Sequence, residues 1–266
     1  MSASQKLAGK RIAVLAADGV EQAELEEPVA ALKEAGAQVV LLALRPGRIR
    51  AMHVHQSGDL MRVDKTVMDA RLSDYDALLV PGGYISPDLL RQSAPARDFV
   101  RQMHGAGKPV ALMSQAPAIL TSAGLAAQRT LTSWPGIRDD MVNAGATWLN
   151  QDVVRDDGCL TCRGPQDITA FIHALLPFFA GEEEAQVALQ AHSDPPQEAP
   201  SETPDQPLRW LSAPSIGAML SLALLGVGVV AANRSRRRKS EAEAEAEAEP
   251  DAEGDAGPAE PRPDTR

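Results

Sequence analysis

The sequence contains few cysteines and fewer basic than acidic residues, and these two features limit the classes of protein to which it can belong. Two cysteines in 266 residues rule out a disulfide framework. The formal net charge of −10 argues against nucleic-acid binding as a main role, because nucleic-acid-binding proteins need a basic surface. The first ten residues lack an apolar segment, so we expect no secretory signal peptide.

The negative charge is concentrated near the C-terminus. Residues 241–266 contain ten Asp or Glu and two Arg, a net charge of −8, so the rest of the chain carries only −2. Alternating Glu and Ala followed by a Pro- and Asp-rich stretch is typical of a disordered tail. We therefore expect a nearly neutral folded part that precedes an acidic tail.

Residues 11–180 alternate between short apolar runs and segments with helical periodicity. This order predicts an α/β fold with a mostly parallel sheet flanked by helices, of the flavodoxin-like kind. A hairpin is expected around Asp157-Gly158. The predicted strands are residues 11–16, 39–44, 77–80, 109–113, 130–133, 153–156 and 159–163, and the predicted helices are residues 21–35, 88–104, 117–124 and 168–180.

Ser114 lies where the predicted strand 109–113 gives way to a helix that begins near Pro117. A sharp turn from strand to helix can hold a nucleophile up into a cleft. In parallel sheets the ligand site lies beyond the carboxyl ends of the strands. Ser114, the Gly82-Gly83 pair and residues 17–24 all fall at that edge, which predicts the functional site there.

Cys159 and Cys162 have the spacing of a redox Cys-x-x-Cys motif, but they lie on a predicted strand. Residues three apart on a strand are about 10 Å apart, which exceeds the roughly 7 Å limit between the Cα atoms of a disulfide. Their side chains also point to opposite faces. Two cysteines make a weak metal site, so we expect ordinary thiols and neither a metal nor a cofactor.

The composition changes after residue 182. Residues 183–209 include five prolines and lack core-forming residues, which predicts an extended linker. Residues 210–233 carry no charge, and about 20 helical residues cross a hydrocarbon core of about 30 Å. Trp210 suits the membrane interface, and basic residues follow at 234–239. We therefore expect one transmembrane helix at 210–233, with a buried core helix as the alternative.

Two orientations of this helix are open. The basic residues favour a cytoplasmic C-terminus, which would place residues 1–209 outside the cell although no signal for their export is visible. We instead expect the domain at residues 1–182 to lie in the cytoplasm, as in a tail-anchored protein. Residues 234–266 are then a basic stop followed by the disordered acidic tail.

Several motifs in order resemble those of the PfpI family, which belongs to the class I glutamine-amidotransferase-like superfamily. The resemblance covers about residues 10–181 and includes residues 47–64, which are similar to a bacterial PfpI subgroup. It implies the family's α/β sandwich and a homodimer formed through this domain. The motifs are Val80-Pro81-Gly82-Gly83 and residues 107–111, 131–140, 143–148 and 161–168.

The resemblance also implies roles for individual residues. By position, Ser114 replaces the family's nucleophilic cysteine and Gln115 replaces the adjacent histidine. Glu24 falls where the family has an acidic side chain in contact with the nucleophile. Gly82 and Gly83 match the turn whose backbone amides can face a developing oxyanion.

Replacing cysteine by serine removes a group that ionises readily. A free thiol has a pKa near 8.5, which a helix N-terminus lowers, whereas a serine hydroxyl needs a neighbouring base. Gln115 cannot be that base, because an amide does not titrate near neutrality. The candidate bases are His53 or His55, from the loop at 47–58, and Glu24 with a pKa raised by burial. The alternative that we favour is a Glu24 carboxyl that only hydrogen-bonds Ser114 in an inert pocket.

These observations predict a membrane-anchored PfpI-like domain that has lost the family's cysteine chemistry and acts as a binding, sensing or stress-associated module for a small molecule of unknown identity. The enzymatic alternative is a serine-based hydrolase or a residual deglycase, glyoxalase or peptidase that uses Ser114 with Glu24. A glutamine-amidotransferase partner is the least favoured option. Glutaminases need a cysteine and a later His/Glu pair, and His173 is the only histidine of the domain after Ser133.

Overall fold

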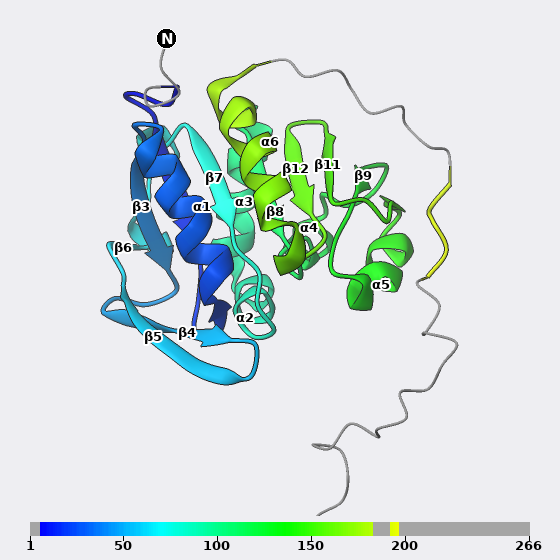
Figure 1. Cartoon of the computed structure of the whole chain (residues 1–266), viewed down its shortest axis with the longest axis horizontal. Helices are drawn as coiled ribbons and strands as arrows, with labels where there is room; N and C mark the ends of the chain where they lie inside the picture. The colour runs from blue at the N-terminus through cyan, green and yellow to red at the C-terminus, as the bar shows by residue number, and fades with distance from the viewer. Residues whose placement is uncertain (1–5, 183–191, 197–266) are drawn as a thin grey trace, which may run out of the picture. The chain divides into compact units, whose positions relative to one another are not determined.

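Figure 1 shows the computed structural model of the chain, which describes residues 6–182 and 192–196. The chain divides into two units, Met1–Glu198 and Ala199–Arg266, and every described residue belongs to the first. The predicted membrane helix at 210–233 and the predicted tail at 234–266 lie outside the described residues. Within the part that is described, no helix is both long enough and apolar enough to cross a bilayer.

The centre of the first unit is a seven-stranded sheet with the order β11-β12-β8-β7-β1-β3-β6. Neighbouring strands are parallel except for the antiparallel hairpin of β11 and β12. The prediction of a mostly parallel α/β sheet is therefore confirmed. The strands are β1 (Arg11–Leu15), β3 (Gln38–Ala43), β6 (Lys65–Thr66), β7 (Ala77–Val80), β8 (Val110–Met113), β11 (Val153–Asp156) and β12 (Cys159–Cys162).

Helices cover both faces of this sheet, and the side chains of each strand alternate between two cores. On β1, Ala13 and Leu15 belong to one core, and Ile12 and Val14 belong to the other, because successive side chains on a strand point to opposite faces. In Figure 1, α1 and α6 lie in front of the sheet and α3 lies behind it. The helices are α1 (Gln22–Glu34), α2 (Ser86–Gln92), α3 (Ala94–Gly105), α4 (Ala118–Ala123), α5 (Arg138–Asn143) and α6 (Ile168–Ala180).

The prediction of one helix over residues 88–104 was wrong, because α2 and α3 are separated at Ser93. Ser93 is extended (φ −78°, ψ 117°), and its hydroxyl accepts a hydrogen bond of 3.4 Å from the Ala96 amide. This is an N-cap, which supplies an acceptor for an otherwise unpaired amide in the first turn of α3. Pro95 follows in that first turn, where the missing N–H of proline costs nothing.

Residues 48–62 form a hairpin that the periodicity of the sequence did not predict. β4 (Arg48–His53) pairs antiparallel with β5 (Gln56–Arg62), and β2 (Val20–Glu21) adds to β4 in parallel. β5 is mostly polar and exposed, so it lacks the alternation that marks a half-buried strand. Gln22 at the start of α1 holds the hairpin through two hydrogen bonds to Asp59, of 2.8 Å to its amide and 3.0 Å to its carboxylate.

A separate two-stranded sheet pairs β9 (Thr130–Leu131) with β10 (Thr147–Trp148) in parallel. The predicted strand at 130–133 is thus shorter than expected and belongs to this small sheet. Residues 192–196, which the sequence assigned to an extended linker, contact β10; we call them the clasp segment. The short 3-10 helices are η2 (Val67–Asp69), η3 (Leu72–Asp74), η4 (Pro135–Ile137) and η5 (Pro165–Asp167).

Candidate functional site

Ser114 occupies a strained turn directly after β8. Its φ of 51° lies in the left-handed region, which is unfavourable for a residue with a side chain and is typical of a nucleophile held on a sharp strand-to-helix turn. Its amide donates to the Cys162 carbonyl at 3.0 Å, and its carbonyl accepts from the Trp134 amide at 2.8 Å. The predicted elbow is therefore present, and two neighbouring segments hold its backbone in place.

Glu24 contacts Ser114 from the first turn of α1. The Ser114 hydroxyl donates a hydrogen bond to Oε1 of Glu24, and the Gly82 amide donates to Oε2 at 2.8 Å. The Glu24 side chain is only 1% exposed. The resemblance implied this acidic contact, and the structure brings the two side chains together across 90 positions of the chain.

Burial raises the pKa of Glu24 to about 7, because a charged carboxylate loses its hydration in the interior. The hydrogen bonds from Ser114 and Gly82 favour the ionised form and oppose this rise, and the nearby Glu21 adds to it. Glu24 therefore exchanges its proton close to neutral pH. Such a group can serve either as a proton acceptor or as a neutral hydrogen-bonding partner.

The Gly82-Gly83 turn packs so tightly that neither position has room for a side chain. A Cβ at Gly82 would lie 2.7 Å from Cβ of Ser114, and one at Gly83, whose φ is 109°, would lie 2.6 Å from the Glu21 nitrogen. The Gly82 amide is already bonded to Glu24. Among the hydrogen bonds of the described residues, none is donated by the amide of Gly83 or Gln115. These two amides are thus the available donors for an oxygen atom of a ligand.

A cleft of about 190 Å³ opens over Ser114. Carboxyl and amide groups of its lining come from Glu21, Glu24, Gln115 and Gln166, and apolar and aromatic groups come from four further residues. Of this lining, the sequence predicted Ser114, Glu24, Gln115 and Gly83. The remaining wall residues were not predicted as site residues, and they are Glu21, Val54, Tyr84, Trp134, Pro165 and Gln166.

Two aromatic rings, those of Tyr84 and Trp134, line this cleft. The rings of Tyr84 and Trp134 meet edge to face at 6.4 Å, and His55 stacks on Tyr84 at 6.1 Å. The hairpin β4–β5 reaches this cleft because the Val54 amide donates to the Glu21 carboxylate at 2.9 Å. One sequence signal could have identified Tyr84, since it directly follows the glycine pair.

None of the histidines in the described residues is a hydrogen-bonding partner of the Ser114 hydroxyl, which bonds only Glu24. His104 lies beside the turn that precedes β12, 3.0 Å from an Arg129 nitrogen, at the opposite end of the sheet from Ser114. His173 is exposed on α6. The alternative of a Ser–His pair with His53 or His55 therefore gains no supporting contact, although His55 stacks on the cleft residue Tyr84.

The two cysteines are free and buried on β12, as the strand interpretation predicted. Cys159 packs in one core and Cys162 in the other, so their side chains point to opposite faces. Burial raises the pKa of Cys159 to about 11 and that of Cys162 to about 12. Among the described residues, no cluster of three or more His, Cys, Asp or Glu side chains is placed to hold a metal ion.

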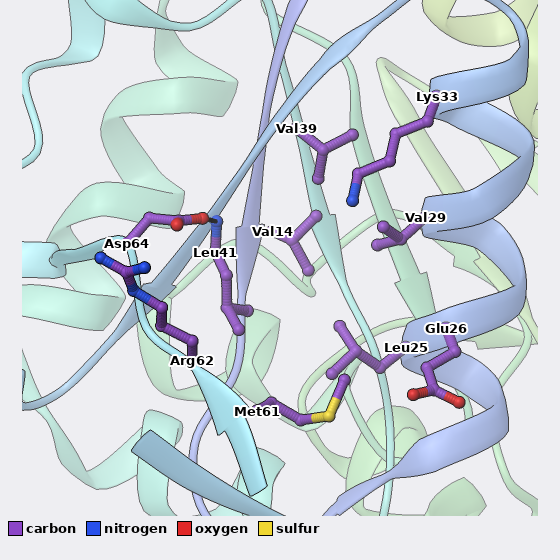
Figure 2. A pocket seen from close by; sticks show the side chains of 10 residues that line it. All are labelled: Val14, Leu25, Glu26, Val29, Lys33, Val39, Leu41, Met61, Arg62 and Asp64. Atoms are coloured by element: carbon purple, nitrogen blue, oxygen red, sulfur yellow. Dashed lines mark hydrogen bonds between the residues drawn. The ribbon is translucent and has the colours of Figure 1, made fainter. Parts of the chain in front are cut away.

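A second groove, of about 240 Å³, lies between α1 and the strands β1, β3 and β5. Figure 2 shows apolar side chains, among them Val14, Val29 and Leu41, surrounded by the charged groups of Lys33 and Arg62 and by further lining residues. None of its lining residues belongs to the Ser114 cleft. The two grooves are therefore separate, and the Ser114–Glu24 pair belongs to the smaller one.

Comparison with known proteins gives a consistent result. Over 162 residues, which are 61% of this chain and 95% of the relative, the chain is 38% identical to the protein named deglycase PfpI of Pyrococcus furiosus. It is 37% identical over 163 residues, 61% of this chain and 94% of the relative, to the putative cysteine protease YraA of Bacillus subtilis. The crystal structure of DJ-1beta of Drosophila melanogaster superposes with a TM-score of 0.60 at 25% identity, over 65% of this chain and 91% of that one. The model of the DJ-1/PfpI family matches residues 10–177, and the chain belongs to that family.

Proposed function

We propose that this protein is a membrane-anchored member of the DJ-1/PfpI family that binds a small polar molecule in the Ser114 cleft without cysteine chemistry. The observation that carries the proposal is the pairing of Ser114 with Glu24 at the elbow. A thiol there would ionise, whereas a hydroxyl stays protonated near neutral pH and contributes a hydrogen bond. The elbow is thus suited to hold a ligand.

The chemistry of the lining indicates the class of ligand. The amides of Gly83 and Gln115, which donate no hydrogen bond within the described part of the chain, suit a carbonyl or carboxylate oxygen. The Gln166 side chain adds further polar contacts, and the rings of Tyr84 and Trp134 supply apolar walls. A small aldehyde, keto acid or carboxylic acid has this combination of an oxygen at one end and apolar atoms at the other.

The membrane anchor is the second part of the proposal. The uncharged segment at 210–233 and the basic residues after it support a single transmembrane helix. We place the DJ-1/PfpI domain in the cytoplasm, although the basic residues after the helix by themselves favour the opposite orientation. Protease treatment of intact cells tests the orientation, and we expect the domain to be protected. Cleavage of the domain under these conditions would show that it lies outside. We also propose that the domain forms a homodimer, which light scattering of the detergent-purified protein would reveal as twice the protomer mass.

The test of the site is an activity and binding assay on the purified full-length protein. We expect no consumption of methylglyoxal and no ester or peptide hydrolysis above the level of Ser114→Ala. We also expect small carboxylates and aldehydes to raise the thermal midpoint of the natural protein more than that of Trp134→Ala, which lacks one wall of the cleft. Turnover that disappears in Ser114→Ala would contradict the proposal.

That contrary result would support a second function, a serine-based hydrolase. The specific observation in its favour is that the carboxyl in contact with the Ser114 hydroxyl has a pKa raised by burial to about 7, which suits a general base near neutral pH. In such an enzyme Glu24 would take the proton of Ser114 during attack. Glu24→Gln would then abolish turnover to the same extent as Ser114→Ala.

A further inference from the structure

The clasp segment, residues 192–196, lies along the edge of β10 that β9 does not use. The other edge of β10 is used by β9, since the Thr147 amide donates to the Arg129 carbonyl and the Leu149 amide donates to the Leu131 carbonyl. The amide and carbonyl of Trp148 point the opposite way. An unpaired strand edge of this kind accepts an extended segment as an additional strand.

Five hydrogen bonds hold the clasp segment, three with Trp148 and Asn150 and two from Arg138. The Trp148 amide donates to the Ser193 hydroxyl at 2.9 Å, and the Asn150 amide donates to the Asp194 carboxylate at 2.8 Å. In return, the Asp194 amide donates to the Trp148 carbonyl at 2.8 Å. Arg138, the first residue of α5, donates twice to the Asp194 carbonyl, at 2.9 and 2.7 Å. The clasp segment contributes the Ser193 hydroxyl, the Asp194 carboxylate and the backbone amide and carbonyl of Asp194 to these bonds.

The local sequence prepares the segment for this conformation. Pro195 follows Asp194 directly and disfavours helical geometry at Asp194, which keeps that residue extended. Pro195 and Pro196 have no amide hydrogen, so the ladder ends after Asp194. In Figure 1 the segment, drawn in yellow, runs past α5, as the contacts with Arg138 require. The guanidinium of Arg138 also lies 5.9 Å from the centre of the Trp148 ring.

We propose that the edge of β10 and Arg138 form a docking site for a Ser-Asp-Pro segment, and that the occupant is the clasp segment of the same chain. The site holds the chain to the domain at Asp194, which is 14 residues after α6 ends at Ala180. It also lies next to the cleft, because the Trp148 indole donates to the Ser133 hydroxyl at 3.0 Å and Ser133 precedes the cleft residue Trp134.

Docking shortens the tether to the membrane anchor, a consequence that rests on the proposed transmembrane helix. Without the clasp, residues 183–209 would connect the domain to Trp210, which is 27 residues and at most about 95 Å of extended chain. With the clasp docked, residues 197–209 make the connection, which is 13 residues and at most about 45 Å. The docking site would therefore restrict how far the Ser114 cleft can move from the bilayer.

Hydrogen exchange of the full-length protein in detergent micelles tests the docking itself, whether or not the anchor spans a membrane. The variant Ser193→Ala/Asp194→Ala removes both side-chain acceptors. We expect exchange of the Trp148 and Asn150 amides to become about tenfold faster or more, with unchanged exchange in β8. The matched control Ser201→Ala/Asp205→Ala changes the same residue types farther along and should leave both amides protected. Equal exchange in the natural protein and the Ser193→Ala/Asp194→Ala variant would overturn the proposal.

Two further measurements identify the occupant. A synthetic peptide of residues 190–198, added to the Ser193→Ala/Asp194→Ala variant, should restore protection of the Trp148 and Asn150 amides. The same peptide with alanine at both positions should not restore it. Failure of the natural peptide at millimolar concentration would contradict a Ser-Asp-specific site.

Protection in the natural protein should not change with protein concentration. Protection that weakens on dilution would show that a second copy supplies the segment and would overturn the intramolecular assignment. If the double variant fails to fold, Arg138→Gln provides the same test by removing the two bonds to Asp194.

Discussion

The hydroxyl of Ser114 donates a hydrogen bond to the carboxyl of Glu24, which is buried beside the elbow and also accepts from the Gly82 amide. This pairing joins the first helix of the domain to the end of the central strand β8. It also places a carboxyl with a pKa of about 7 against a hydroxyl that does not ionise near that pH. The properties of the cleft therefore depend on the protonation of Glu24.

The stability of the domain should depend on pH through Glu24. Its pKa is about 7 in the folded protein against an ordinary value of 4.5, so the folded state binds the proton more tightly. The stabilisation is fully present below about pH 4.5 and is lost as the pH rises through 7. At about 1.4 kcal/mol per pKa unit, the whole effect is about 3 kcal/mol. Because the natural protein loses this stabilisation as the pH rises and Glu24→Gln does not, the free energy of unfolding of Glu24→Gln relative to the natural protein should increase by about 2–3 kcal/mol from pH 5 to pH 8, as measured in urea. A constant difference between the two proteins would contradict this interpretation.

Restoring the family's reactive pair should create activity. In Ser114→Cys/Gln115→His a thiol occupies the strained elbow, beside Glu24 and close to the start of α4, where thiolates form readily. We expect methylglyoxal consumption at least about tenfold above that of Ser122→Cys, which places a thiol on α4 away from the cleft lining. A silent double variant with an intact fold would show that the cleft has lost more than its nucleophile.

The glycine at position 82 should contribute to the stability of the domain. A Cβ there would lie 2.7 Å from Cβ of Ser114 and 2.8 Å from the Met113 carbonyl oxygen, and such crowding costs about 1–3 kcal/mol. Gly82→Ala should lower the free energy of unfolding by this amount, as measured in urea. Gly105→Ala is the matched control, because no atom lies within 4 Å of its added Cβ and the residue ends α3. Equal effects of the two substitutions would exclude the crowding.

The two cysteines should be unreactive in the native protein. Burial raises the pKa of Cys159 to about 11 and that of Cys162 to about 12, and only the thiolate is nucleophilic. At pH 8 we expect no labelling by a maleimide within minutes in buffer and labelling of both residues in guanidinium chloride, as counted by intact-protein mass spectrometry. Rapid labelling without denaturant would show that β12 opens easily.

Much of the fold could be predicted because its signals are local. The apolar runs of β1, β7 and β8 are buried on both faces of the sheet, and such strands are recognised without knowledge of their partners. The hairpin β4–β5 escaped prediction because its polar second strand depends on contacts with α1, such as those of Gln22 with Asp59. The break between α2 and α3 had a local signal in Ser93 and Pro95, which helical spacing alone did not reveal.

The sequence by itself determined the alternation of buried strands and helices in the central sheet, the turn that carries Ser114 and the opposite facing of Cys159 and Cys162. Each of these follows from the geometry of a few consecutive residues. Only the tertiary structure decided that Glu24 is buried with a pKa of about 7, that Tyr84 and Trp134 meet in the lining of the cleft, and that Asp194 docks on β10. These properties depend on desolvation and on contacts between distant parts of the chain, which exist only after the sheet and its helices have packed together.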